Sequence, residues 1–572
     1  SDVKAGVNTF TYVNQTSQVA GCYVEAGSGH GRAVWWGFRA EINPVFSPQD
    51  FSVNGINRGS SLDLTFEFPE IIMKSIYWAT NAPVLHALPT FSSRFDDYWG
   101  AAGDAEGDQD ASDFSAWLSY MKNKGIPMSQ AHVTRHVGDP RNSWSDCKAM
   151  EWHDQRVTTS PPANCTPFAM AVCQAENEGW FEWTTHGWTH YGNGSDPDEF
   201  SESYDYGTFM HTSHGIFDHL NESIYEAETI FSRYDYSINH EDINVFTVCG
   251  SSLYGNKSVY ASSQLGIEYV YGIAWSGWLF PNGTATSTAD NGKYTIDEES
   301  LGVWQAMVGV NTDDPSSAEI SNKSRLEWNG YAWLSMPSNM FSHAGSWSND
   351  EWSADVPNEY IDMLEDTVEN FNWMRILWME DQGDYDKGFK TNDWTKFNMT
   401  WDGAVIDIAD NVPVDYIIRL PADKYTVDVT VDSQNWLVWS DSEVYVPASA
   451  TSISITTSNS KTETPHVQTV RRANINVTAS SYADEKLSVT TNGIKNLYSE
   501  IEVYCGSEGE PTTVTGATSW SYDSTTKICT INVTHSSSQT VTLDWSIPTT
   551  YWNPSVTIIW GIVPIIFIVG TS

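Results

Sequence analysis

The stretch of residues 180–190 reads Trp180-Phe181-Glu182-Trp183-Thr184-Thr185-His186-Gly187-Trp188-Thr189-His190. Its first half is an apolar run with β-branched threonines, which favours a buried strand. Its second half places two imidazoles, His186 and His190, directly after that strand. In parallel β/α folds, functional residues lie just after the carboxyl ends of strands. The stretch therefore predicts one strand of a parallel sheet with a candidate site at its end.

Short apolar runs alternate with amphipathic helices between about residues 81 and 383. Helices are expected near 112–125, 216–231 and 357–371, because apolar residues there fall on one face. The expected strands are 84–91, 129–134, 180–184, 243–248, 267–273, 303–308 and 373–379. Alternation over this length predicts an irregular parallel β/α barrel.

The flanking regions show the two-residue alternation of β-strands instead. Residues 1–80 are rich in Gly, Ser, Asn and Thr and alternate at 62–68, which predicts an N-terminal β-rich region. After residue 384 the helical pattern disappears, and clear alternation occurs at 425–431 and 452–456. We expect two small β-sandwiches there, at 384–460 and 461–550.

Acidic and imidazole side chains follow several of the expected barrel strands. Asp96 and Asp97 follow the first strand, His186 and His190 follow the third, and His343 follows a strand that ends near residue 340. Glu380-Asp381 follows the last strand. Because parallel strands end at the same edge, these groups are expected to meet there.

Such a set of side chains is suited to metal-assisted hydrolysis. Two imidazoles and one carboxylate give three protein ligands and leave a position open, which is the catalytic type of zinc site. A second carboxylate can act as a base, and another histidine as an acid. Taken singly, an Asp pair is usually a solvated turn and a His-x-x-x-His pair is often incidental. Their shared placement after strands favours a site.

Four segments carry a resemblance to one family: Phe95-Asp96-Asp97, His186 to His190, residues 246–255, and Phe341-Ser342-His343. With these motifs, residues 80–383 resemble the polysaccharide deacetylases, which are metal-dependent carbohydrate N-deacetylases. Two departures are visible. Gly187 stands where the family usually has Ser or Thr, and Val248-Cys249-Gly250 replaces its usual Arg and Pro.

The resemblance implies a role for each matching residue. Asp97, His186 and His190 would bind a divalent metal, expected to be zinc. Asp96 would be the base and His343 the acid. The substrate would be an N-acetylated glycan or a cell-wall polysaccharide. In the family, the Arg that is absent here orients the base, so its loss bears on activity more than on fold.

The composition excludes other classes of protein. Acidic residues number 73 and basic residues 29, which gives a net charge of −44. Phosphates would be repelled, so we expect no nucleic-acid partner. The chain is 40% hydrophobic and has 27 Trp, enough apolar material for large cores, which excludes wholesale disorder.

Cysteines and sequons indicate an extracellular or surface protein. Cys505 and Cys529 lie on two apolar alternating runs that can pair, and we predict a disulfide between them. Asn-x-Ser/Thr sequons, which suggest glycosylation, occur at Asn14, Asn164, Asn193, Asn221, Asn256, Asn282, Asn322, Asn398, Asn476 and Asn532.

The C-terminal segment 551–572 contains a strongly apolar run at 556–569. This run suits a membrane anchor, an assembly strand buried in a neighbouring subunit, or a core strand of this chain. We expect it to attach the protein to a membrane or an assembly. The rival to the enzyme is a structural surface protein, such as a layer, sheath, filament or virion-spike subunit, that keeps the barrel as a scaffold.

Overall fold

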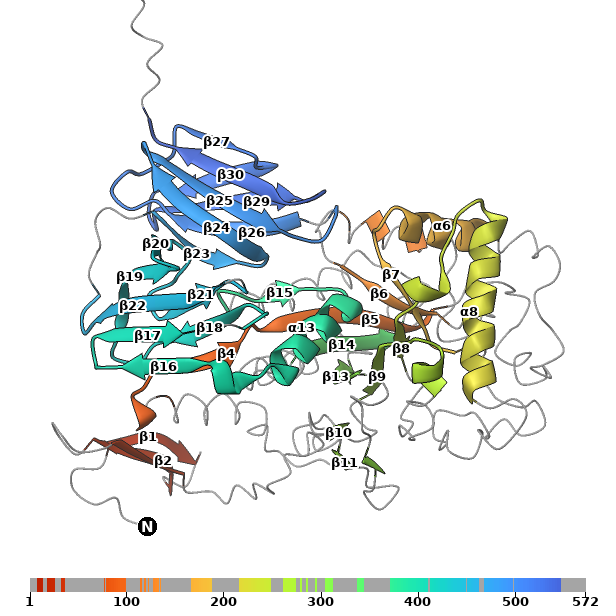
Figure 1. The fold of residues 1–572 in the computed structure, drawn as a ribbon, viewed down its shortest axis with the longest axis horizontal. Coiled ribbons are helices and arrows are strands. Elements are labelled where there is room, and N and C mark those ends of the chain that lie inside the picture. The colour runs from red at the N-terminus through yellow and green to blue at the C-terminus, as the bar shows by residue number, and fades with distance from the viewer. Residues whose placement is uncertain are drawn as a thin grey trace, which may run out of the picture.

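The computed structural model describes three strands within residues 8–36, residues 77 and 79–98, parts of 114–134, and residues 166–187, 216–247 and 261–273. It also describes short strands within 278–311, residues 337–343, and residues 371–546 apart from 410, 411, 449, 462–467 and 497. In Figure 1 the barrel strands lie on one side and the C-terminal sheets on the other.

Seven parallel strands form a closed ring. In pairing order they are β5 (Thr90–Tyr98), β6 (Ser129–His132), β7 (Glu182–Thr185), β8 (Val245–Thr247), β9 (Tyr269–Ile273), β13 (Trp304–Asn311) and β14 (Ser338–His343). The ring closes because β14 pairs with β5 as well as with β13. A short strand, β15 (Arg375–Ile376), lies beside the start of β5. The parallel strands of the predicted β/α barrel are confirmed.

Two helices, α6 (Thr166–Asn177) and α8 (Ile216–Arg233), lie beside β7 (Figure 1). Leu220 and Ile224 of α8 are buried at helical spacing, as predicted for 216–231. The ring of Phe231 in α8 meets Trp183 of β7 edge-on, with centroids 5.3 Å apart. The described residues of 112–125 are helical, and 357–370 lie outside the described residues.

The run 84–91, predicted as one barrel strand, forms two strands in different sheets. β4 (Val84–Ala87) pairs antiparallel with β18 (Tyr416–Arg419) of the C-terminal sheets, and β5 begins only at Thr90. Pro89 separates the two strands because it has no N–H for a ladder. As Figure 1 shows, β4 lies beside β18 in the C-terminal sheets, and the chain then continues into the first barrel strand.

The C-terminal half consists of four small antiparallel sheets. The first sheet contains, in pairing order, β16 (Asn398–Trp401), β17 (Val405–Ala409), β22 (Ser452–Ser458), β19 (Tyr425–Val431) and β20 (Gln434–Asn435), and the second contains β21 (Glu443–Val446), β18 and β4. The third sheet contains β23 (Thr469–Ala473), β26 (Tyr498–Tyr504), β29 (Ile528–Thr534) and β28 (Ser519–Asp523). The fourth sheet contains β24 (Asn476–Ala483), β25 (Lys486–Asn492), β30 (Gln539–Asp544) and β27 (Thr513–Thr515). The predicted antiparallel β-structure after residue 384 is confirmed. The buried residues of these sheets form one continuous hydrophobic core on both sides of residue 460.

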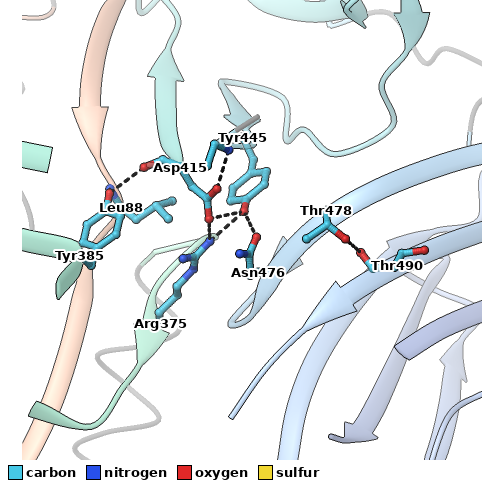
Figure 2. Close-up of polar contacts among 9 residues, drawn as sticks. Leu88, Arg375, Tyr385, Asp415, Tyr445, Asn476, Thr478 and Thr490 are labelled. Atoms are coloured by element: carbon cyan, nitrogen blue, oxygen red, sulfur yellow. Dashed lines mark hydrogen bonds and ion pairs between the residues drawn. The ribbon is translucent and has the colours of Figure 1, made fainter. Parts of the chain in front are cut away.

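A buried polar cluster joins the barrel to these sheets (Figure 2). The guanidinium of Arg375, on β15, pairs with the carboxylate of Asp415 and donates to the hydroxyl of Tyr445 at 2.8 Å. That hydroxyl also lies 2.8 Å from Asp415 and from Oδ1 of Asn476. On the other side, Tyr385 donates to the Asp415 carbonyl at 2.9 Å. Arg375 and Asp415 are 8% and 4% exposed. The barrel is therefore joined to the sheets by an ion pair that is shielded from water.

The predicted N-terminal β-region contains one antiparallel sheet of β1 (Asn8–Val13), β2 (Gln18–Glu25) and β3 (Arg32–Trp36). A second small antiparallel sheet, β10 (Trp278–Leu279), β11 (Thr284–Thr286) and β12 (Tyr294–Thr295), lies between barrel strands in sequence. Within the part of the chain that the structure describes, no helix is long and apolar enough to cross a membrane. The apolar segment 551–572 lies outside the described residues.

Candidate metal and catalytic site

The strand β5 contains a β-bulge at the predicted acidic pair. Phe95 stands opposite Gln130 of β6, but the next pairing is Tyr98 with His132, so β5 has one residue more than β6 over this interval. The extra residue falls at Asp96 and Asp97. A bulge breaks the strict alternation of a strand and re-aims side chains, and such bulges often occur next to active sites. The regular alternation of β5 is therefore interrupted at the acidic pair.

The predicted acid and base lie on adjacent strands. β14 pairs in parallel with β5, and His343 stands opposite Asp96 in that register. Neighbouring strands are about 4.8 Å apart. His343 is the last residue of β14. Asp96 lies within β5, near its carboxyl end, whereas the sequence placed it after a strand that ended at residue 91.

His186 is buried and its backbone continues the ladder between β6 and β7. Its N–H donates to the carbonyl of His132 at 2.9 Å, and it is only 1% exposed. Trp183 and Thr185 contact α8, on the outer face of the sheet. Because side chains alternate along a strand, His186 belongs to the opposite face, which lines the inside of the ring.

The imidazole of His186 is oriented by β8. Its Nδ1 lies 2.9 Å from both the carbonyl oxygen and the hydroxyl of Thr247. Sequence analysis did not single out Thr247, because only the pairing of β7 with β8 brings it beside His186. A threonine at the end of a barrel strand is a weak signal by itself.

The complete ligand set is not covered by the described side chains. His190 lies outside the described residues, and only the backbone is described for Asp96, Asp97 and His343. Among the side chains that the structure describes, no group of three His, Cys, Asp or Glu could hold a metal. The three-ligand metal site stays a prediction.

The prediction that Glu380-Asp381 joins this site is wrong. Both residues belong to the first turn of α13 (Met379–Thr391), at the amino ends of the barrel strands. Glu182, the first residue of β7, accepts the N–H groups of Met379 and Glu380 at 2.9 Å each. Because β15 is only two residues long, the chain turns into α13 before it can reach the carboxyl-end rim.

Glu182 is a buried carboxyl that sequence reasoning missed. It also accepts from the hydroxyl of Ser129, and burial raises its pKa to about 8. Burial, and next the charge of Glu182, raises the pKa of nearby Glu176 well above its usual range. The helix N-terminus explains why an acid is placed here, since free N–H groups and the helix dipole favour a carboxylate. The contacts of Glu182 indicate a structural role at the floor of the barrel.

The predicted disulfide between Cys505 and Cys529 is not formed in the structure, where both are buried free thiols. Cys529 stands opposite Val503, two residues before Cys505, so the two cysteines are diagonal rather than direct cross-strand neighbours. Diagonal Cα atoms in antiparallel sheets are about 7–8 Å apart, beyond the usual range for a disulfide. The two thiols still interact with each other.

Four of the predicted glycosylation sites lie within the described side chains. Asn221 and Asn398 are exposed, and Asn476 and Asn532 are half-buried. The Oδ1 atom of Asn476 is 2.8 Å from the buried hydroxyl of Tyr445. The other six sequons lie outside the described residues.

Comparisons with known proteins give only distant likenesses. No sequence model of a known protein family matches the chain, and no curated protein does. Among solved structures, a family 4 carbohydrate esterase from Streptomyces lividans is 8% identical; the match covers 50% of this chain and 91% of that one, with a TM-score of 0.24. A candidate polysaccharide deacetylase from Mycobacterium smegmatis is 10% identical over 54% and 95% of the two chains, with a TM-score of 0.29. A candidate glycoside hydrolase/deacetylase from Parabacteroides distasonis is 8% identical over 61% and 82%, with a TM-score of 0.33.

Proposed function

We propose that the chain is a metal-dependent carbohydrate N-deacetylase whose site lies at the carboxyl ends of β5, β7 and β14. The observation that carries the proposal is the β-bulge at Asp96-Asp97, with His343 opposite Asp96 in the neighbouring strand. β-Bulges are common at the rims of barrels and next to active sites, where they re-aim a side chain.

The imidazole of His186 is held in the way that a metal ligand usually is. A metal-binding histidine usually gives its second ring nitrogen to a carbonyl or carboxylate, and Nδ1 of His186 meets the Thr247 carbonyl in that way. His186 would then bind through Nε2, together with Asp97 and with His190 from the same loop. Two imidazoles and one carboxylate favour zinc over calcium or magnesium, which prefer all-oxygen ligands.

The chain's own residues would carry the proton transfers. A bound metal supplies a Lewis acid that polarises the acetamido carbonyl and lowers the pKa of a nearby water. Asp96 accepts the proton of the water as it attacks the carbonyl carbon. His343, on the adjacent strand, donates a proton to the departing amine nitrogen, which releases acetate and leaves a free amino sugar.

The substrate is an N-acetylated glycan, and the protein acts outside the cell or at a surface. The exposed sequons at Asn221 and Asn398 are accessible to a glycosylating enzyme. The segment 551–572 attaches the protein to a membrane or to an assembly. The charge of −44 leaves no role for nucleic acid.

The test is acetate release from chitin oligosaccharides and from N-acetylated cell-wall glycan, with zinc added and with a chelator. Acetate that forms with zinc and stops with the chelator supports the proposal. A protein that binds one zinc per chain and releases no acetate supports the structural surface protein instead. The residues Val248-Cys249-Gly250, where the family has Arg and Pro, favour that alternative. No zinc binding at all would refute the metal site.

A further inference from the structure

A cluster of buried hydroxyl groups lies directly behind His186. The hydroxyl of Ser223, on α8, is 2.6 Å from the hydroxyl of Thr185 at the end of β7 and 2.6 Å from that of Thr134, which follows β6. All three residues are 0% exposed. One helix side chain thus contacts the ends of two barrel strands.

The cluster holds the backbone of the residue that follows His186. Ser223 donates to the carbonyl of Gly187 at 3.2 Å, and the N–H of Thr134 donates to the same oxygen at 3.2 Å. The N–H of Gly187 donates to the hydroxyl of Thr185, also at 3.2 Å. Gly187 has φ of +97°, a conformation that other residues rarely adopt, and it offers no hydroxyl of its own. The Gly187 carbonyl is therefore held by α8 and by Thr134, and its N–H by Thr185 at the end of β7.

A second arm of the same network reaches the imidazole. Thr247, which is 0% exposed, donates from its hydroxyl to the carbonyl of Thr185 at 3.2 Å. The same hydroxyl lies 2.9 Å from Nδ1 of His186. Thr185 therefore links Ser223 to Thr247 through its own hydroxyl and carbonyl. Buried hydroxyl groups are costly to leave without hydrogen bonds, so such a network favours one arrangement of its members.

We infer that Ser223 is a positioning residue of the candidate site, which fixes the His186–Gly187 backbone and, through Thr185 and Thr247, the orientation of the His186 ring. As far as the metal is concerned, this inference rests on the proposed function. The described contacts of Ser223 are to residues other than the predicted ligands. Its effect passes through backbone and hydroxyl contacts, as for other residues that orient metal ligands.

The test compares Ser223→Ala with wild type and with Ser232→Ala, a serine on the exposed face of the same helix. Zinc affinity is measured by competition with a chromogenic chelator. Hydrogen exchange of residues 183–190 is measured on the metal-free full chain. Ser223→Ala is expected to weaken zinc binding by about 10–100-fold and to speed exchange in this segment. Ser232→Ala is expected to change neither. Thr134→Val, which removes one hydroxyl at nearly constant shape, should give a smaller effect in the same direction.

The outcomes separate this inference from the proposed function. If wild type binds no zinc, the metal site is refuted, and the exchange experiment still decides the role of Ser223. If wild type binds zinc and Ser223→Ala matches it in both affinity and exchange, the positioning role is overturned. A variant that loses thermal stability but keeps wild-type zinc affinity and wild-type exchange at 183–190 likewise contradicts the inference.

Discussion

The orientation of the His186 imidazole depends on residues from two other elements of the chain. Thr247 contacts Nδ1, and Ser223 holds the carbonyl of the following glycine. Each of these partners is fully buried. At the scale of single residues, the His186 ring and the backbone after it are therefore held by buried hydrogen bonds, and such support is what catalytic and metal sites require.

The first prediction concerns the base. Asp96→Asn keeps the size of the side chain but removes its ability to accept a proton. We expect acetate release to fall by about 10²–10⁴-fold, with zinc affinity unchanged, because Asp96 is not a predicted ligand. Asp428→Asn, the same change at an exposed position of β19, is the control and should be fully active. A fully active Asp96→Asn enzyme would show that another group is the base.

The second prediction concerns Gly187. Its φ of +97° disfavours any side chain, so Gly187→Ala should lower the free energy of unfolding by about 1–2 kcal/mol. Gly403, with φ of +95° and open space where the methyl group of an alanine would lie, provides a matched control far from the site. Both variants should lose similar stability in urea unfolding. Only Gly187→Ala should also lose zinc affinity. Equal zinc affinity in the two variants would show that the backbone at Gly187 does not affect metal binding.

At the scale of elements, the sequence predicts the barrel well, because parallel strands and amphipathic helices have distinct periodicities. The helix at 216–231 and the strand before His186 are both where the pattern places them. The run 84–91 was less predictable, because composition does not show which sheet a strand joins. Glu380 was misplaced since a two-residue strand leaves no pattern of its own. Thr247 and Ser223 become visible only through tertiary pairing.

The third prediction concerns Glu182, between β7 and α13. Burial raises its pKa to about 8, whereas an unfolded chain has about 4.3. The folded protein therefore keeps a proton that the unfolded chain releases. Between these two pH values stability falls as pH rises, by about 1.4 kcal/mol per pH unit for one proton. Below the unfolded-state pKa, Glu182 is protonated in both states, so it does not make the free energy of unfolding depend on pH.

Glu182→Gln resembles the protonated carboxyl and cannot titrate. The amide nitrogen of Gln cannot accept one of the two N–H groups that Glu182 accepts, so the variant should be less stable than wild type near pH 5, and this difference should shrink toward pH 8, in urea unfolding measured across that range. Some slope should remain, because the pKa of Glu176 is also raised by burial. Glu510→Gln, at an exposed position, should leave the profile unchanged. If the free energy of unfolding changed with pH in the same way for Glu182→Gln and wild type, Glu182 would be ionised in the folded protein.

At the scale of the whole molecule, several described contacts connect the barrel and the C-terminal sheets. β4 continues into β5, the Arg375–Asp415 cluster crosses between β15 and the sheets, and Asn496 donates to the carbonyl of Glu178 at 2.9 Å. The buried residues of all four C-terminal sheets form one core that also includes Leu88 and Trp373. These contacts favour cooperative unfolding over independent domains.

The last prediction tests that connection through Asp415. Asp415→Asn leaves the buried guanidinium of Arg375 without its anionic partner, and breaking a buried pair in this way costs about 3–5 kcal/mol. Urea unfolding should shift to lower concentration by that amount and remain a single transition. The double variant Arg375→Met with Asp415→Asn should recover part of the loss, because no unpaired buried charge remains.

The control is Lys396→Met, which removes the exposed pair of Lys396 and Asp393. Those side chains are 63% and 51% exposed, and a pair of this kind contributes at most about 1 kcal/mol. If Asp415→Asn were no more destabilising than Lys396→Met, the polar cluster would not join the two parts of the chain. If Asp415→Asn instead split unfolding into two transitions, the barrel and the sheets would fold separately, with the cluster as their main coupling rather than the shared core.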